Sequence, residues 1–124
     1  MYIRTNHPKY RFNQPVGEVR VGIHEDDTSG LEATINPFKG PTDLLLPSGR
    51  TGRPIANVDF SGEDLNRQVI LQVPIEEGEE DFDIWVYKST NKLWIRLVTS
   101  FINNENSRYL EARLMASDPP IAVG

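Results

Sequence analysis

The chain of 124 residues contains no cysteine, and His7 and His24 are its two histidines. Without thiols it has no disulfide framework, no thiolate nucleophile and no cysteine zinc site. Two imidazoles are too few for a histidine-rich metal site within one chain, although a site shared between subunits stays open. These absences exclude many of the usual chemistries of small proteins.

Long apolar runs are also missing, since no stretch approaches the roughly 20 residues that span a bilayer. The first residues lack the apolar run of a secretory signal peptide, and no Asn-x-Ser/Thr acceptor site is present. We therefore expect a protein of the cytoplasm or of a virion, neither secreted by a classical signal nor membrane-spanning. The net charge of −5 argues against nucleic acid as a general partner.

The charges are unevenly placed along the chain. The first fifteen residues contain three basic side chains and no acidic one, whereas residues 76–83 contain Glu76, Glu77, Glu79, Glu80, Asp81 and Asp83. Such segments are usually solvated. A second interpretation is that the basic arm meets an acidic surface on a neighbouring copy or partner, in an association that salt would weaken.

Short alternating segments separated by Gly and Pro, nine of each, indicate many short strands joined by turns. No long window has a helical period. The sequence predicts an all-β, mainly antiparallel β-sandwich or jelly-roll-like domain. We assign residues 1–17 to an extended N-terminal arm, residues 18–116 to the sandwich and residues 117–124 to an irregular C-terminal tail.

Alternation of apolar and polar residues predicts the first strands, and a capping-box pattern predicts one helical turn at residues 61–68. A long Gly/Pro loop at 37–54 contains three consecutive leucines, which we expect to form a short buried strand or plug. The strands are expected at 18–24, 31–35, 55–60 and 69–73.

The last third of the chain reads as three consecutive strands, at 82–88, 92–102 and 109–115. A slip of one residue would turn every side chain to the wrong face, so matching the aliphatic faces predicts the register. The predicted pairs are Ile84 with Leu97, Val86 with Ile95, Trp85 with Arg96, Tyr87 with Trp94, Phe101 with Leu110, and Leu97 with Leu114.

The opposite face of this predicted meander is rich in aromatic, arginine and methionine side chains, a composition typical of interface centres. It comprises Trp85, Tyr87, Trp94, Arg96, Tyr109, Arg113 and Met115. One interpretation is that another protein subunit covers this face. The other is that the chain covers it itself, with the N-terminal arm or the 37–54 loop.

The N-terminal arm offers two further aromatic contacts, Tyr10 and Phe12, flanked by prolines that remove backbone donors. The predicted partner-binding residues are therefore Trp85, Tyr87, Trp94, Arg96, Arg113, Tyr10 and Phe12. In the loop at 47–54, glycines beside Arg50 and Arg53 could receive an anion, and contact with an acidic neighbour is the favoured interpretation.

No metal, cofactor or catalytic residue is assigned. The run from His24 to Asp27 lacks the spacing of a calcium loop and is better explained as a polar hairpin tip, while calcium in the acidic run at 76–83 stays open. No serine lies in a nucleophile elbow. Two distant carboxylates could converge, but nothing in the sequence selects such a pair.

The composition and the expected fold favour a non-enzymatic structural or assembly protein. Its most concrete form is a small virion accessory subunit, such as a capsid decoration or cement protein or a tail or neck component, that binds other subunits through the aromatic face and the arms. The alternatives are a carbohydrate-binding β-sandwich module with exposed Trp and Tyr, and a small enzyme of unknown class.

Overall fold

The computed structural model describes residues 9–27, 30–62, 67–104, 107–115 and 119–124. Within these ranges the chain forms strands and no helix, so none of the described segments is a helix that could cross a membrane. The strands are β1 (Tyr10–Phe12), β2 (Arg20–His24), β3 (Glu32–Asn36), β4 (Arg53–Ser61), β5 (Gln68–Pro74), β6 (Ile84–Lys88), β7 (Leu93–Arg96), β8 (Thr99–Asn104), β9 (Ser107–Met115) and β10 (Pro120–Val123).

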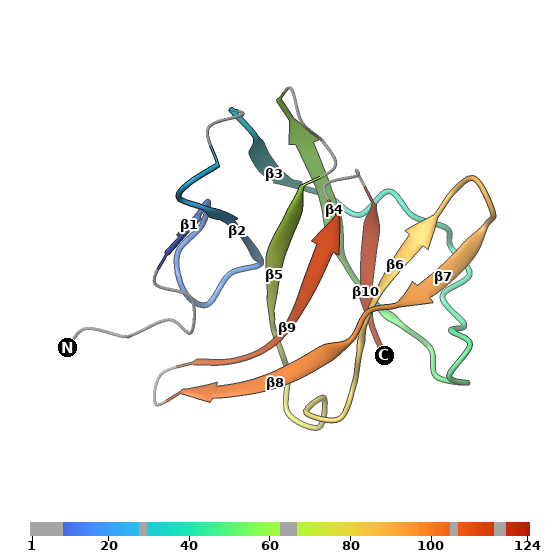
Figure 1. Cartoon of the computed structure of the whole chain (residues 1–124). Helices are drawn as coiled ribbons and strands as arrows, with labels where there is room; N and C mark the ends of the chain where they lie inside the picture. The colour runs from blue at the N-terminus through green and yellow to red at the C-terminus, as the bar shows by residue number, and fades with distance from the viewer. Residues whose placement is uncertain (1–8, 28–29, 63–66, 105–106, 116–118) are drawn as a thin grey trace.

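The strands form two antiparallel sheets of five strands each, which confirms the predicted all-β sandwich (Figure 1). Sheet A has the order β1-β2-β5-β9-β8, and sheet B has the order β3-β4-β10-β6-β7. All strand pairs are antiparallel. The chain therefore crosses repeatedly between the two layers.

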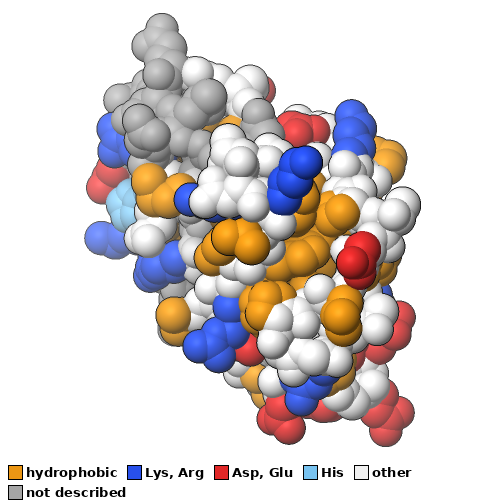
Figure 2. All heavy atoms as spheres, turned by 90° about the vertical axis from the view of Figure 1, so that its right-hand side faces the viewer, with side chains coloured by type: hydrophobic (Ala, Val, Ile, Leu, Met, Phe, Trp, Pro, Cys, Tyr) orange, Lys and Arg blue, Asp and Glu red, His pale blue; other side chains and the backbone are white. Residues whose placement is uncertain are grey.

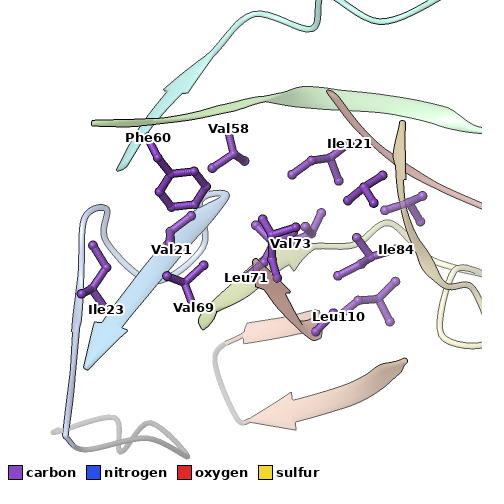
Figure 3. Close-up of a cluster of buried hydrophobic side chains, with 14 of the residues drawn as sticks. Val21, Ile23, Val58, Phe60, Val69, Leu71, Val73, Ile84, Leu110 and Ile121 are labelled. Atoms are coloured by element: carbon purple, nitrogen blue, oxygen red, sulfur yellow. The ribbon is translucent and has the colours of Figure 1, made fainter. Parts of the chain in front are cut away.

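The core lies between the two sheets, where apolar side chains from alternate strand positions meet (Figure 3). Val21 and Leu71 from sheet A and Val58, Ile84 and Ile121 from sheet B have no exposed surface. Because successive side chains of a strand point to opposite faces, a central strand such as β5 contributes every second residue to this layer, namely Val69, Leu71 and Val73. This alternation is the pattern from which the strands were predicted.

The predicted register of the last third is confirmed except for the pair of Leu97 with Leu114, which is wrong because Leu97 bonds to Ile84 of sheet B. Val86 pairs with Ile95 and Tyr87 with Trp94. In the next hairpin Phe101 pairs with Leu110, as expected. Face matching predicted these pairs because a slip of one residue would turn the buried Val86 and Leu110 away from the core.

The prediction of one continuous strand at 92–102 is wrong. β7 belongs to sheet B and β8 to sheet A, and the chain changes sheets at Leu97 and Val98. Leu97 stays beside β6, where its N–H donates to the Ile84 carbonyl at 2.9 Å, and the β8–β9 ladder begins at Thr99. The Thr99 hydroxyl supports the crossing, since it accepts from the Ile84 N–H at 3.0 Å and donates to the Leu97 carbonyl at 2.9 Å.

The expectation of an irregular tail at 117–124 is also wrong for the described residues 119–124, while residues 117 and 118 lie outside the described ranges. β10 lies in the middle of sheet B and pairs with β4 on one side and β6 on the other. Pro120 is its first residue, a position at which a strand tolerates the missing donor. The C-terminal segment is therefore an integral strand of the sandwich.

The N-terminal arm ends in an edge strand of sheet A, because β1 pairs with β2 from Tyr10 opposite His24 to Phe12 opposite Gly22. The rest of the predicted arm up to residue 8 lies outside the described residues. So do residues 63–66, on which the predicted helical turn falls. The segments on either side of that turn belong to β4 and β5.

The central position of β10 predicts a large effect of truncating its side chains. We expect Ile121→Ala to lower the free energy of unfolding by about 3 kcal/mol, because the fully buried side chain leaves a cavity between the sheets. Urea unfolding measures the change, with Val98→Ala as the control, since Val98 is 92% exposed. Equal, small effects of the two substitutions would show that residues 120–123 behave as a tail.

Candidate interaction surface

The aromatic face of β6 and β7 is closed within the chain. Trp85 and Trp94 are 5% and 9% exposed. The side chains that pack with them come mostly from the loop at residues 37–52, which runs beside β6 and β7 in Figure 1. These neighbours are Phe38, Leu44, Leu46, Ala122 and Tyr87. Of the two alternatives drawn from the sequence, cover by the chain's own loop is the one observed.

Aromatic ring contacts and one hydrogen bond hold the tryptophans beneath the loop. The Phe38 ring stacks parallel to Trp94 with centroids 6.4 Å apart, and Tyr87 meets Trp94 at 5.2 Å in a tilted arrangement. The Trp85 indole N–H donates to the Gly124 carbonyl at 2.9 Å. The Trp94 indole nitrogen is buried without a hydrogen-bond partner among the described residues. A partner protein cannot reach either indole while the loop is in place.

The covering loop is held by its own turn as well as by packing. The Leu46 N–H donates to the Arg50 carbonyl at 2.9 Å, and the Gly52 N–H donates to the Leu44 carbonyl at 2.7 Å. The predicted plug is confirmed, because Leu46 is 2% exposed and Leu44 is half-buried in the aromatic cluster. Leu45, between them, points outward and is 62% exposed.

Arg53 binds an acid of its own chain. Its Nε donates to Glu79 Oε2 at 2.8 Å and its Nη2 donates to Glu79 Oε1 at 2.7 Å, so the pair is bidentate. This hydrogen bonding lowers the pKa of Glu79 and raises the pKa of Arg53. Glu79 Oε1 also accepts from the Glu76 N–H at 2.8 Å, which anchors the acidic loop.

Arg50 lies over the Phe82 ring, 4.5 Å from its centroid, and thus contacts the same acidic segment. Two other acids of this segment are paired as well. Glu80 pairs with Arg108, and Asp83 pairs with Arg96 at 3.8 Å between the charged atoms. The basic loop predicted to reach an acidic neighbour therefore meets one within the chain.

The change of sheet at Leu97 divides the predicted contact face between sheet B and sheet A. Arg96 belongs to the outer face of sheet B with the two tryptophans, whereas Arg113 is exposed on the outer face of sheet A. Arg113 lines a cavity of about 410 Å³ together with Gln68, Ile70, Val98, Ser100, Glu111 and Ala112. The two groups lie on opposite sides of the sandwich, so they cannot form one surface.

A row of polar side chains crosses the outer face of sheet A next to this cavity. Arg20 Nε donates to Gln72 Oε1 at 2.8 Å, and Gln72 Nε2 donates to Glu111 Oε1 at 2.8 Å. Burial lowers the pKa of Arg20. The row is held by its internal hydrogen bonds, because buried polar groups need partners.

The two aromatic residues of the arm lie at the β1 edge. The Tyr10 ring meets His24 edge-on at 5.0 Å. Phe12 packs over Gly22, where an added Cβ would come within 2.7 Å of the ring, and the Arg20 guanidinium lies 3.9 Å from its centroid. Both rings are half-buried against their own chain.

A different apolar surface was missed from the sequence. It consists of exposed side chains along β7, β8 and the crossing between them, which we call the open edge; its residues are Leu93, Ile95, Val98 and Phe101, which are 52%, 38%, 92% and 37% exposed. Alternation placed Leu93 and Ile95 in the core, but β7 is an edge strand and neither residue belongs to the core cluster between the sheets. Figure 2 looks onto the side of the molecule that holds β6 and β7 and shows hydrophobic side chains gathered near its middle.

Metal-binding clusters are not found among the described residues, where no three His, Asp or Glu side chains converge. At the tip after β2, His24 Nδ1 accepts from the Asp26 N–H at 3.1 Å, as in a polar hairpin turn. In the acidic segment, the nearest cations to Glu79, Glu80 and Asp83 are arginines.

Comparison with known proteins adds no family to this description. None of the protein-family models, curated proteins or solved structures compared with the chain matches it.

The buried position of Leu46 predicts a change in tryptophan fluorescence when its side chain is shortened. We expect Leu46→Ala to shift the tryptophan emission to longer wavelength and to increase quenching by acrylamide, because water reaches Trp85 and Trp94. Emission spectra and quenching constants measure this, and Leu45→Ala is the matched control on the same loop. Unchanged spectra in the Leu46 variant would show that the loop is not what shields the indoles.

The Arg53–Glu79 pair predicts a dependence of stability on pH. Because the pKa of Glu79 is lower in the folded chain, the pair stabilises fully above the unfolded pKa of about 4.3 and is lost as the pH falls through the folded pKa. We expect Glu79→Gln to cost about 2 kcal/mol at pH 7, and the difference from the unaltered chain to shrink in acid. Urea unfolding across this pH range measures it, with Glu77→Gln, an exposed acid of the same loop, as the control; equal losses would contradict the pairing.

Proposed function

We propose that this chain is a non-enzymatic assembly protein that binds neighbouring protein subunits through the open edge. The observation that supports this function is the exposure of four apolar side chains along β7, β8 and the crossing between them, Leu93, Ile95, Val98 and Phe101. Soluble monomers seldom leave contiguous apolar patches uncovered, and such patches commonly mark protein contacts.

The covered state of the two tryptophans supports the choice of the open edge as the contact region. The loop at 37–52 already covers Trp85 and Trp94, so these side chains stabilise the chain itself. Basic side chains border the open edge, with Lys92 exposed before β7 and Arg96 exposed at its end. An apolar centre with a charged rim is the usual anatomy of a protein interface.

The setting that we propose is an accessory subunit of a virion, such as a decoration or cement protein or a tail or neck component. A small sandwich without cysteine, whose first and last described strands, β1 and β10, lie within the two sheets, suits repeated placement on a larger symmetric surface. This setting rests on those general features and on the proposed contact region.

The two alternatives have less support. A carbohydrate-binding module was expected to offer Trp85 and Trp94 as a flat platform, and both rings are covered. An enzyme needs convergent polar groups with assigned roles in a deep pocket. In the cavity beside Arg113, Glu111 accepts a structural hydrogen bond from Gln72, and no reaction follows from that arrangement.

Assembly through the open edge predicts a mass that rises with concentration. We expect the chain to form a dimer or larger species in size-exclusion chromatography with light scattering, and the double substitution Ile95→Lys and Phe101→Lys to return it to a monomer. Leu45→Lys, at a more exposed position (62%) on the loop, should leave the mass unchanged. A chain that stays monomeric from micromolar to millimolar concentration would contradict self-assembly through this edge.

A further inference from the structure

The outer edge of β7 presents backbone groups with no partner among the described residues. The Leu97 N–H donates to the Ile84 carbonyl, and the ladder with β6 pairs Ile95 with Val86. Antiparallel ladders alternate, so Leu93, Ile95 and Leu97 direct their N–H and C=O groups toward β6. It follows that Trp94 and Arg96 direct theirs away from the sheet.

We propose that this edge pairs with the same edge of a second copy, antiparallel and related by a two-fold axis through Ile95. The contact would join the two copies of sheet B, five strands from each, into one continuous sheet. This inference rests on the proposed assembly function and names its partner. A two-fold contact uses the same residues on both sides and closes on itself.

Hydrogen bonding limits the possible registers to three. Only Trp94 and Arg96 of β7 offer outward groups, so the axis passes through Trp94, Ile95 or Arg96. With the axis at Ile95, Trp94 of each copy exchanges both backbone hydrogen bonds with Arg96 of the other. The two Ile95 residues then face each other in a non-hydrogen-bonded pair, where side chains approach most closely.

Charge selects among the three registers. An axis at Trp94 places Lys92 opposite Arg96 of the second copy, and an axis at Arg96 places that arginine opposite itself. Like charges directly opposite destabilise a strand pair. The axis at Ile95 is free of both conflicts.

The side chains on the inner face agree with that choice. With the axis at Ile95, Leu93 lies opposite Leu97 of the second copy, and Ile95 lies opposite Ile95. The pairing therefore forms a continuous apolar stripe. In the single chain, Leu93 and Ile95 of this stripe are 52% and 38% exposed, and Leu97 is partly buried. Burial of this stripe supplies the hydrophobic contribution that backbone pairing alone lacks.

The other three edge strands are less suited to self-pairing. β1 is three residues long, and β3 has the exposed Glu32 and ends before Pro37. β8 alternates Thr99, Phe101 and Asn103 on its inner face, so a self-pair would have no apolar stripe. Natural sheets protect their edges with prolines, bulges and inward charges, whereas β7 has the sequence Leu-Trp-Ile-Arg and pairs with β6 without a register shift.

Single cysteines test the register directly, because the chain has none of its own and every disulfide must form at the introduced residue. We expect Ile95→Cys to convert fully to a disulfide-linked dimer under mild oxidation, since facing residues of a non-hydrogen-bonded pair have Cα atoms about 4.5 Å apart, within the range for a disulfide. Arg96→Cys and the control Val98→Cys should stay monomeric on a non-reducing gel. Urea unfolding of each reduced variant confirms that it is folded.

Hydrogen exchange on the unaltered chain gives a second measurement. The amides of Trp94 and Arg96 should be protected at high concentration and lose that protection on dilution, whereas those of Ile95 and Leu97, bonded to β6, should be protected at both concentrations. Protection of Trp94 and Arg96 that does not depend on concentration would overturn the pairing.

The outcomes separate this inference from the proposed function. If the chain oligomerises but cross-links through Arg96→Cys, or through a cysteine at Phe101 of β8, the axis at Ile95 is wrong while assembly stands. An oligomer without any cross-link through Ile95→Cys leads to the same conclusion. A chain that is monomeric at every concentration overturns this inference and self-assembly through the open edge together.

Discussion

The rest of the structure depends on the insertion of β10 between β4 and β6. These two strands would otherwise be unpaired edges, and β10 supplies hydrogen bonds to both. Its side chains serve two clusters at once, because Ile121 packs in the core between the sheets and Ala122 packs under the aromatic loop. The residue after it, Gly124, accepts the Trp85 indole N–H and exchanges backbone hydrogen bonds with Asp83.

The loop at 37–52 and the acidic loop at 76–83 pack against the outside of the strands that β10 joins. The loop at 37–52 covers the tryptophans and leads directly into β4, whose first residue, Arg53, binds Glu79. Side chains typical of interfaces are therefore used to hold long loops against a small sandwich. The open edge is where we propose that a neighbour binds, because the described residues leave Leu93 and Ile95 exposed there.

Periodicity predicted the parts of the fold that depend on which face is buried. It gave the pairing of Val86 with Ile95 and of Phe101 with Leu110, because a slipped register would expose the core. It did not reveal the change of sheet at Leu97, since apolar alternation continues through that point. The two consecutive prolines argued against a strand at the position of β10. The apolar character of Leu93 predicted a core position, but its exposure is decided by the place of β7 at the edge of sheet B.

The order in which strands enter sheet B has a consequence for how the protein reaches its native state. β10 pairs with strands that begin 67 and 36 residues earlier, counting from Arg53 and Ile84 to Pro120. Contacts so distant along the chain require large loops to close first, which slows folding. During synthesis on the ribosome, β4 and β6 would therefore wait with exposed backbone until residues 120–123 emerged, and chaperones that bind unpaired strands would have their opportunity in that interval.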